Sequence, residues 1–411
     1  MISEVSIANF KGISSVNISL SKVNVFVGEN GTGKSTVAHA LAMLSRSLNA
    51  SSLDINLPFI NLGPFSKLVP PGERGTITLK GTERIPGSPS LEVKYSLRVE
   101  FDSQGLYGYK TEVSTSALNN LKVTNTWIRY GSSTVTPASL NIEGITYVLA
   151  PSGVIGKAFK PGAYTYPPPS IPEMENRARE IYELLNAISN VPTTSLQKVR
   201  VVPILRGFLE PMYPILPSTS SEFNIRGLMH SVGSEMASRL VYMDPQSKEK
   251  IQNWLKRIFD AKIDWRVEPG PQVSIFNADR DVYLVNEGFG INQMVFVLAE
   301  MLGSKVVIVE EPEIHLHPKA QFLLGRLISE ISVKEDVQVI LITHSENIVS
   351  GILHAVRSKT IKPEDATIWL FEKKEKGNTA NRCSINEDGT TDEGLKTFME
   401  ASILELSDII G

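Results

Sequence analysis

The chain has 411 residues, of which 42% are hydrophobic and 21% charged, and its net charge is −3. This is the composition of an ordinary globular protein and excludes a largely disordered chain. No apolar run is long enough to span a membrane, and the first residues lack the features of a secretion signal, so we expect a cytoplasmic protein. The single cysteine, Cys383, excludes an intrachain disulfide and a cysteine-cluster metal site.

The small negative charge gives no overall attraction to nucleic acid or anionic lipid. A local basic patch remains an alternative. Acidic residues are interspersed among its candidates, which favours a solvated face of mixed charge. The candidates are Lys198, Arg200, Arg206, Lys248, Lys250, Lys256 and Arg257.

The first third of the chain predicts strands, one helix and then a β-rich region. Alternating apolar and polar residues predict strands over residues 2–8 and 16–20, and an apolar run predicts a buried strand over residues 23–27. Apolar residues at helical spacing predict a helix over residues 34–48. From residue 51 to about 147 we expect a mostly antiparallel β lobe, with strand patterns over residues 76–79, 91–101, 107–113 and 123–128.

The middle of the chain has the pattern of an insertion. Six prolines between Pro151 and Pro172 exclude a helix or a central strand there. An amphipathic helix is predicted over residues 173–188. We therefore expect three parts, residues 1–150, 151–198 and 199–411.

Strands alternate with helices in the last third of the chain, which predicts a parallel sheet covered on both faces. A strand over residues 199–203 and a helix over 247–259 come first, followed by strands over 263–267, 272–276 and 282–285 and a helix over 291–301. The remaining predicted elements are strands over residues 305–309, 337–342 and 367–371 and helices over 318–331 and from about 346.

Residues 28–36 match the phosphate-binding pattern G-x-x-x-x-G-K-[ST], between a predicted strand and a predicted helix. Backbone N–H groups of such a turn, at a helix N-terminus, cradle a triphosphate. Lys34 would reach the β- and γ-phosphates, and Ser35 would hold Mg²⁺. The other predicted binding residues are Asn30, Gly31, Thr32, Gly33 and Thr36.

Two further segments carry chemistry at the ends of predicted strands. Glu310 and Glu311 follow an apolar strand, at the end where an open α/β sheet binds its ligands. One of these carboxylates suits the Mg²⁺ shell, and the next can orient and deprotonate the water that attacks the γ-phosphate. His344 follows the next parallel strand and can donate a hydrogen bond to phosphate or to that water.

Several segments resemble the ABC-type ATPase heads of the SMC, RecF and OLD-like (overcoming-lysogenization-defect) group. Residues 7–13 are similar to its NF(K/R) start, which places Lys11 among the nucleotide-binding residues, and residues 28–35 are similar to its Walker A motif. Residues 310–318 are close to the EEPExHLHP run that joins Walker B to the D-loop, and residues 343–345 are similar to the H-switch. Residues 202–206 look like the strand and arginine that follow the insertion in OLD-like ATPases.

The resemblance implies a P-loop ATPase head in which Glu310 is the Walker B metal ligand, Glu311 the catalytic base and His344 the switch histidine. It also implies a homodimer that sandwiches ATP and Mg²⁺. Residues 286–293 stand where the signature motif would be, and Gly288 and Gly290 would approach the γ-phosphate bound by a second copy. The EEPExHLHP resemblance favours a D-loop over a zinc half-site for His315 and His317.

Two features depart from the group. Gln104 is not in a convincing Q-loop context, and the 67 residues after His344 are too few for the Toprim nuclease domain of full-length OLD proteins. We therefore expect an ATP-hydrolysing switch whose dimer regulates a separate effector, such as a nuclease, in antiphage defence. A RecF-like ATPase that binds DNA for repair is the alternative, and a transporter ATPase subunit fits less well because LSGGQ is lost.

Overall fold

The computed structural model describes residues 1–47, 53–57, 61–85, 88–116, 121–130, 133–135, 138–142, 145–149, 184, 187–216, 229–270, 272–374, 377–391 and 395. The predicted proline-rich segment and most of the predicted helix over 173–188 lie outside the described residues. Within them, no helix has the length and apolarity that crossing a membrane requires.

The first sheet is antiparallel and confirms the predicted β lobe. Its strands are β1 (Ile2–Phe10), β2 (Ile13–Ser19), β4 (Gly75–Ile85), β5 (Ser88–Asp102), β6 (Gly105–Thr115), β7 (Leu121–Tyr130), β8 (Ser133–Val135), β9 (Ala138–Ile142) and β10 (Ile145–Leu149). They lie in the order β10-β9-β7-β6-β5-β4-β1-β2, with β8 beside β7. The first two strands of the chain belong to this lobe because β1 pairs with β4, where Ile7 faces Ile77.

The second sheet carries the phosphate-binding loop. Its strands, in spatial order, are β11 (Val199–Val202), β16 (Val306–Glu310), β17 (Gln338–Ile342), β3 (Val23–Gly28), β18 (Ala366–Glu372) and β19 (Thr379–Cys383). Neighbouring strands are parallel except for β19, which forms an antiparallel hairpin with β18. The chain thus has the predicted α/β architecture with β3 inside the sheet.

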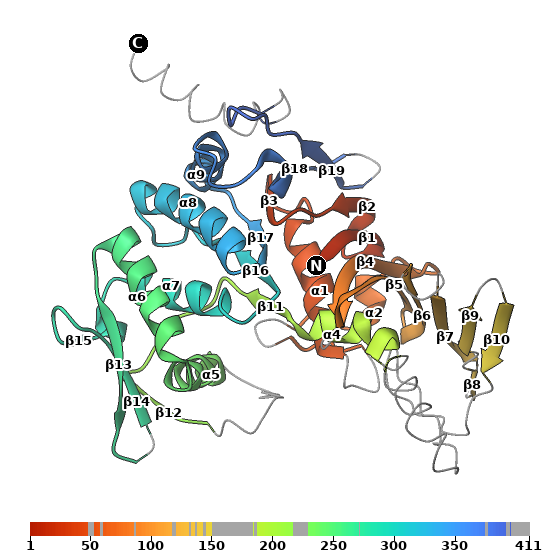
Figure 1. Ribbon diagram of the computed structural model, residues 1–411, viewed down its shortest axis with the longest axis horizontal. Helices are drawn as coiled ribbons and strands as arrows, with labels where there is room; N and C mark the ends of the chain where they lie inside the picture. The colour runs from red at the N-terminus through yellow and green to blue at the C-terminus, as the bar shows by residue number, and fades with distance from the viewer. Residues whose placement is uncertain are drawn as a thin grey trace.

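Alternate residues of the parallel strands pack into two separate hydrophobic cores. In β3, Val25 and Val27 belong to one core and Phe26 to the other. Helix α1 (Lys34–Ser47) and the antiparallel sheet cover the face of Phe26. Helices α7 (Phe289–Glu300), α8 (Pro318–Lys334) and α9 (Glu346–Arg357) cover the opposite face. Figure 1 shows this layering, with the β lobe on one side and the helices on the other.

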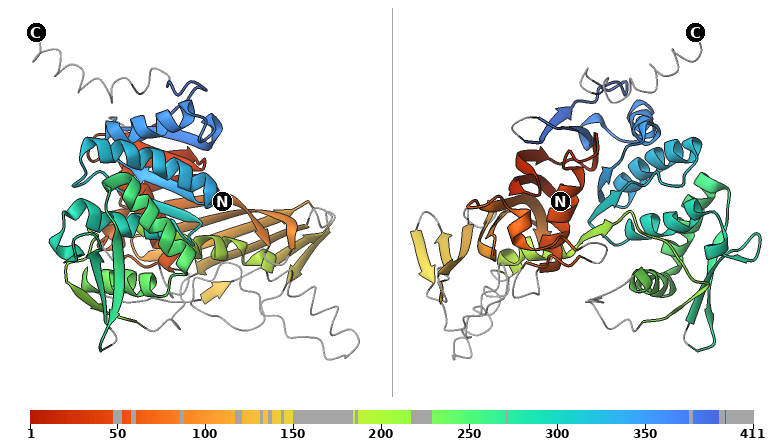
Figure 2. Two further views of the ribbon diagram at one scale, coloured as in Figure 1. Left: turned by 60° about the vertical axis from the view of Figure 1, so that its left-hand side comes forward. Right: turned by 180° about the vertical axis from the view of Figure 1, so that it is seen from behind.

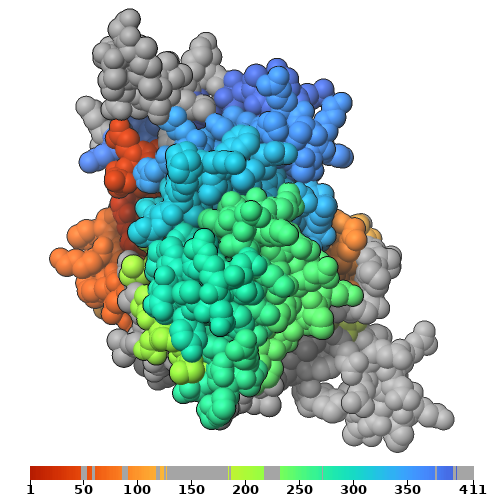
Figure 3. All heavy atoms as spheres, turned by 90° about the vertical axis from the view of Figure 1, so that its left-hand side faces the viewer, coloured from red at the N-terminus to blue at the C-terminus, as the bar shows by residue number. Residues whose placement is uncertain are grey.

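A third, smaller sheet packs with helices α5 (Met229–Val241) and α6 (Pro245–Phe259). Residues 229–300 and α8 form a continuous face of the molecule (Figure 3), and Figure 2 shows the long β lobe extending away from them. The residues of helix α6 that were predicted to face inward are buried. Helix α5 was not predicted. The predicted strand over 282–285 is shorter in the structure and ends at Tyr283. The strands of this sheet are β12 (Met212–Pro214), β13 (Ile263–Glu268), β14 (Gln272–Asn277) and β15 (Val282–Tyr283). The described residues also include the short helices α2 (Phe65–Leu68), α4 (Val191–Gln197), η1 (Leu284–Asn286) and η2 (Pro363–Asp365).

Candidate nucleotide site

The predicted phosphate-binding residues form the turn after β3 and the first turn of α1. Gly28 has φ of 136°, and a Cβ atom on it would lie 2.1 Å from the carbonyl oxygen of Phe371. Glycine is therefore required where β3 passes β18. Gly31 and Gly33 also have positive φ, and Asn378 donates a hydrogen bond to the carbonyl oxygen of Gly31 at 3.1 Å.

Lys34 is held over this turn by uncharged acceptors. Its ammonium group donates to the carbonyl oxygens of Gly28, at 2.8 Å, and Glu29, at 2.7 Å. Burial lowers the pKa of Lys34 to about 8, against the attraction of Glu311 and other nearby carboxylates. The lysine is thus 5% exposed and already directed into the loop that would hold phosphates.

Ser35 and Glu310 form a pair of oxygen donors between α1 and β16. The Ser35 hydroxyl hydrogen bonds to the Glu310 carboxyl group, which is 4% exposed at the end of its strand. Burial raises the pKa of Glu310, and the negative charge of Glu311 adds to this. A buried carboxylate and a hydroxyl fit a hard divalent cation such as Mg²⁺, which would complete its shell with water and phosphate oxygens.

Glu311 begins the loop after β16 in a strained backbone conformation, with φ of 43°. Its N–H donates to the carbonyl oxygen of Ile342 at 2.7 Å, which ties it to the end of β17. The Glu311 carboxylate acts electrostatically on both Lys34 and His344. It therefore lies in the same site as the two basic side chains.

Arg206 fixes the backbone of both carboxylates, a role that the sequence reasoning missed. It is 4% exposed and donates to the carbonyl oxygens of Pro203 at 2.6 Å, Glu310 at 2.7 Å and Glu311 at 2.9 Å. Burial lowers the pKa of Arg206 to about 10. Its inclusion among the candidates for a basic surface patch was wrong, because the side chain is buried beneath the site.

Most of the other patch candidates have acidic partners in the described part of the chain. The ion pairs are Lys198–Glu83, Lys248–Asp264, Lys250–Glu335 and Arg257–Glu330. This pairing fits the favoured interpretation, a solvated face of mixed charge.

Glu313 connects the loops that follow β16 and β17. Its carboxylate accepts a hydrogen bond from the Thr343 hydroxyl at 2.7 Å and another from the His344 N–H at 2.6 Å. Burial lowers the pKa of His344, and the positive charge of Lys34 lowers it further, which keeps the imidazole neutral. Glu313 lies within the quoted motif, but the pattern alone gave it no role.

Lys11 reaches the same site from the turn between β1 and β2. Its ammonium nitrogen lies 2.6 Å from His39 Nδ1, on α1. Burial lowers the pKa of Lys11, and the negative charge of Glu310 opposes this shift. The structure therefore brings Lys11, Lys34, Glu310, Glu311 and His344 together from four separate segments.

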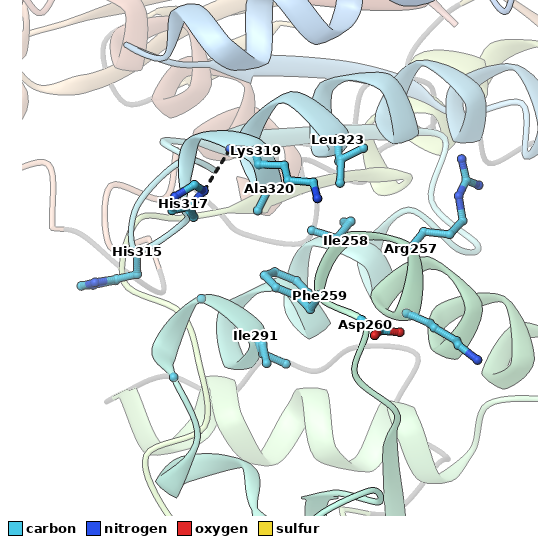
Figure 4. Close-up of a pocket in the computed structure, with 13 residues that line it drawn as sticks. Arg257, Ile258, Phe259, Asp260, Ile291, His315, His317, Lys319, Ala320 and Leu323 are labelled. Carbon is cyan, nitrogen blue, oxygen red and sulfur yellow. Dashed lines mark hydrogen bonds between the residues drawn. The ribbon is translucent and has the colours of Figure 1, made fainter.

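Gly288 and Gly290 lie apart from these residues, at the start of α7. A Cβ atom on Gly288 would meet no atom within 4 Å, whereas one on Gly290 would lie 2.6 Å from the carbonyl oxygen of His315. Gly290 is thus required for packing within the chain. Both glycines line a cavity of about 530 Å³ between α6, α7 and α8 (Figure 4).

The two histidines of the His-x-His pair have separate partners. The His315 ring packs edge-on against Phe289, with centroids 5.1 Å apart. His317 caps α8 by accepting a hydrogen bond from the N–H of Lys319 at 3.3 Å, drawn in Figure 4. The described residues contain no cluster of three or more histidine, cysteine or acidic side chains that could hold a metal ion.

Comparison with known proteins shows one protein family that matches the chain and one relative that matches a short part of it. The model of the AAA ATPase domain family (AAA_15) matches residues 1–129 and 218–349, more than half of the chain. An OLD nuclease of Thermus scotoductus is 42% identical over 64 residues, which are 14% of this chain and only 12% of that protein's length.

The solved structures that resemble the chain include SMC heads at low sequence identity. The SMC head domain from Thermotoga maritima matches with a TM-score of 0.41 at 13% identity, over 94% of this chain and 99% of that one. An SMC head bound to the C-terminal winged-helix domain of ScpA matches with a TM-score of 0.49 at 14% identity, over 93% of this chain and 98% of that one. Because the family match covers more than half of its length, the chain belongs to the AAA ATPase domain family.

Proposed function

We propose that this chain binds ATP with Mg²⁺ and hydrolyses it to ADP and phosphate. The supporting observation is the convergence of Lys34, the Ser35–Glu310 pair, Glu311 and His344 at the carboxyl edge of three adjacent parallel strands. Residues 30–36, with Lys34 among them, would hold the phosphates, and Ser35 and Glu310 would hold Mg²⁺, which would supply positive charge to the phosphates when bound. Lys11 adds a second positive charge on the same side.

In this mechanism Glu311 accepts the proton of the attacking water, while neutral His344 donates a hydrogen bond to the γ-phosphate. The strained backbone of Glu311 and its anchors on Ile342 and Arg206 hold the carboxylate in place before the substrate arrives.

A second copy completes the site with the start of its α7. Gly288 leaves the helix N-terminus open, and the first turn of α7 contains no acidic residue, which suits the approach of an anionic phosphate. Gly290 keeps α7 against the loop at His315, so it shapes this surface. Because α7 and α1 cover opposite faces of the sheet, the start of α7 is available to the nucleotide of a partner copy.

ATP binding would thus join two copies and hydrolysis would separate them, which makes the chain a switch for an effector protein. The name of the short OLD nuclease match favours a nuclease as that effector. Antiphage defence is the setting that we expect from the resemblance of the motifs alone.

Light scattering of the Glu311→Gln variant with and without ATP and Mg²⁺ tests the proposal. This variant should bind ATP and form a dimer, because turnover is blocked after binding. Lys34→Ala should not bind ATP. A Glu311→Gln protein that stays monomeric when saturated with ATP refutes the dimer, and a Lys34→Ala protein with unchanged ATP affinity refutes the site.

The same assay locates the contribution of the second copy. Adding Gly288→Glu to the Glu311→Gln background should abolish the dimer and leave ATP binding to the monomer unchanged, because a carboxylate at the helix start opposes the phosphate bound by the other copy. Gly288→Ala is the matched control and should still dimerise, since its Cβ atom meets no neighbour. If ATPase activity instead rises with duplex DNA and falls steeply with salt, the RecF-like alternative is correct.

A further inference from the structure

Lys11 is held in place by its backbone as well as by its side chain. Asn9, Lys11 and Gly12 have φ values of 51°, 44° and 82°, so three of four consecutive residues in this turn lie in the left-handed region. The Lys11 N–H donates to the carbonyl oxygen of Leu68 at 2.9 Å. A turn that is strained and anchored in this way gives the side chain a definite direction.

His39 is the partner of the Lys11 ammonium group. It lies on α1, five positions after Lys34, and is 7% exposed. Its Nδ1 atom is 2.6 Å from Lys11 Nζ, a charge-assisted hydrogen bond in which the ammonium donates. Burial and the positive charge of Lys11 lower the pKa of His39 to about 4, so its ring is a neutral acceptor.

The charges of Glu310 and Lys11 act on each other, although the structure shows no ion pair between them. A direct Lys11–Glu310 ion pair would occupy the carboxylate that pairs with Ser35 in the proposed cation site. Lys34 follows the same pattern, because its ammonium group also bonds to uncharged acceptors, here carbonyl oxygens, and forms no ion pair with Glu311.

We propose that His39 is a positioning residue that holds Lys11 Nζ away from Glu310 and so keeps Glu310 and Ser35 available to a divalent cation. The identity of the cation and nucleotide rests on the proposed function. The placement of Lys11 does not, because it concerns contacts within the chain alone.

The first test measures Mg²⁺ dependence. Binding of a fluorescent ATP analogue is titrated with Mg²⁺ in wild type, His39→Leu and His39→Gln, with His354→Leu as a matched histidine control on α9. His39→Leu should raise the half-saturating Mg²⁺ concentration about tenfold, the lower end of the effect of residues that support metal ligands. His39→Gln keeps an acceptor and should stay close to wild type, as should His354→Leu.

Whether the effect of His39→Leu requires Lys11 distinguishes a positioning role of His39 from a merely structural one. In a Lys11→Ala background, His39→Leu should cause no further change in the Mg²⁺ titration, because the competing ammonium is gone. A similar weakening in both backgrounds, or an unchanged titration in His39→Leu, refutes the inference.

The second test needs no nucleotide. Acetylation of the Lys11 amine, followed by mass spectrometry, should be several-fold slower in His39→Leu than in wild type, because pairing with Glu310 shields the amine. Adding Glu310→Gln to His39→Leu should bring the rate back to the wild-type value or above it, because neither partner then holds the amine. Faster acetylation in His39→Leu would show that Lys11 moves to solvent and refute the inference, whether or not the chain hydrolyses ATP.

Discussion

Replacing Arg206 with methionine removes the donor that holds both carboxylate-bearing residues from below. Methionine fills most of the volume of the arginine stem but leaves the carbonyl oxygens of Pro203, Glu310 and Glu311 without this partner. Hydrogen bonds from a charged donor contribute about 1.5–3 kcal/mol each, and relief from burying the guanidinium offsets part of their loss. We expect the free energy of unfolding to fall by about 3–5 kcal/mol, as when one partner of a buried charged contact is removed.

Urea denaturation followed by circular dichroism measures this loss, and steady-state ATPase assays measure its effect on the site. We expect kcat to fall about 100-fold, since Glu311 loses an anchor of its strained backbone and moves relative to the attacking water. Arg200→Met is the matched control, because Arg200 also donates to carbonyl oxygens but is exposed on β11. A loss below about 1 kcal/mol in Arg206→Met, with kcat unchanged, would contradict the assigned role of the buried arginine.

Two further predictions concern the phosphate-binding turn and the pH dependence of stability. Gly28→Ala should lower the free energy of unfolding by about 3 kcal/mol, because its Cβ collides with the Phe371 carbonyl. Gly31→Ala should lower it by only about 1 kcal/mol, because of its positive φ alone. Equal losses of stability in thermal melts of the two variants would contradict this. Hydrogen bonds and charge from Arg257 and Lys334 lower the pKa of Glu330 to about 2 from an ordinary value of 4.5, so its stabilisation is present above about pH 4.5 and is lost as pH falls toward 2. Glu330→Gln should therefore be about 1 kcal/mol less stable than wild type at pH 7 and match it near pH 2, and a difference that is constant with pH would refute the ion pair as its cause.

The sequence predicted those strands and helices whose buried face is marked by the spacing of their own apolar residues. The apolar run of β3 is buried along its whole length, and the inward residues of α6 at helical spacing are all buried. Lys34, Ser35, Glu310 and Glu311 could be chosen as candidates because each lies at or after the end of a strand, and the ends of neighbouring parallel strands meet at one edge.

The supporting residues of the site could not be predicted, since their roles depend on contacts between distant segments. In the sequence, nothing distinguishes Arg206 from the other basic residues. Its role depends on the pairing of β11 with β16, which brings its guanidinium group beneath Glu310. Glu313 accepts hydrogen bonds from residues that follow the next strand, and His39 on α1 contacts a lysine from the turn between β1 and β2. Helix α5 carries glycine and serine within its length, which weakens its helical pattern.

The place of β3 in the parallel sheet also sets the order of events during synthesis. Both of its neighbours, β17 and β18, begin only at residues 338 and 366, so the strand that leads to the phosphate loop has no partner until most of the chain exists. At about 5–20 residues per second, this delay is roughly 15–60 seconds. The antiparallel lobe, whose strands follow one another closely, has no such wait. An apolar segment that is exposed for that time is a natural client for a chaperone. Slowing translation should increase aggregation of the nascent chain without changing the stability of the folded protein.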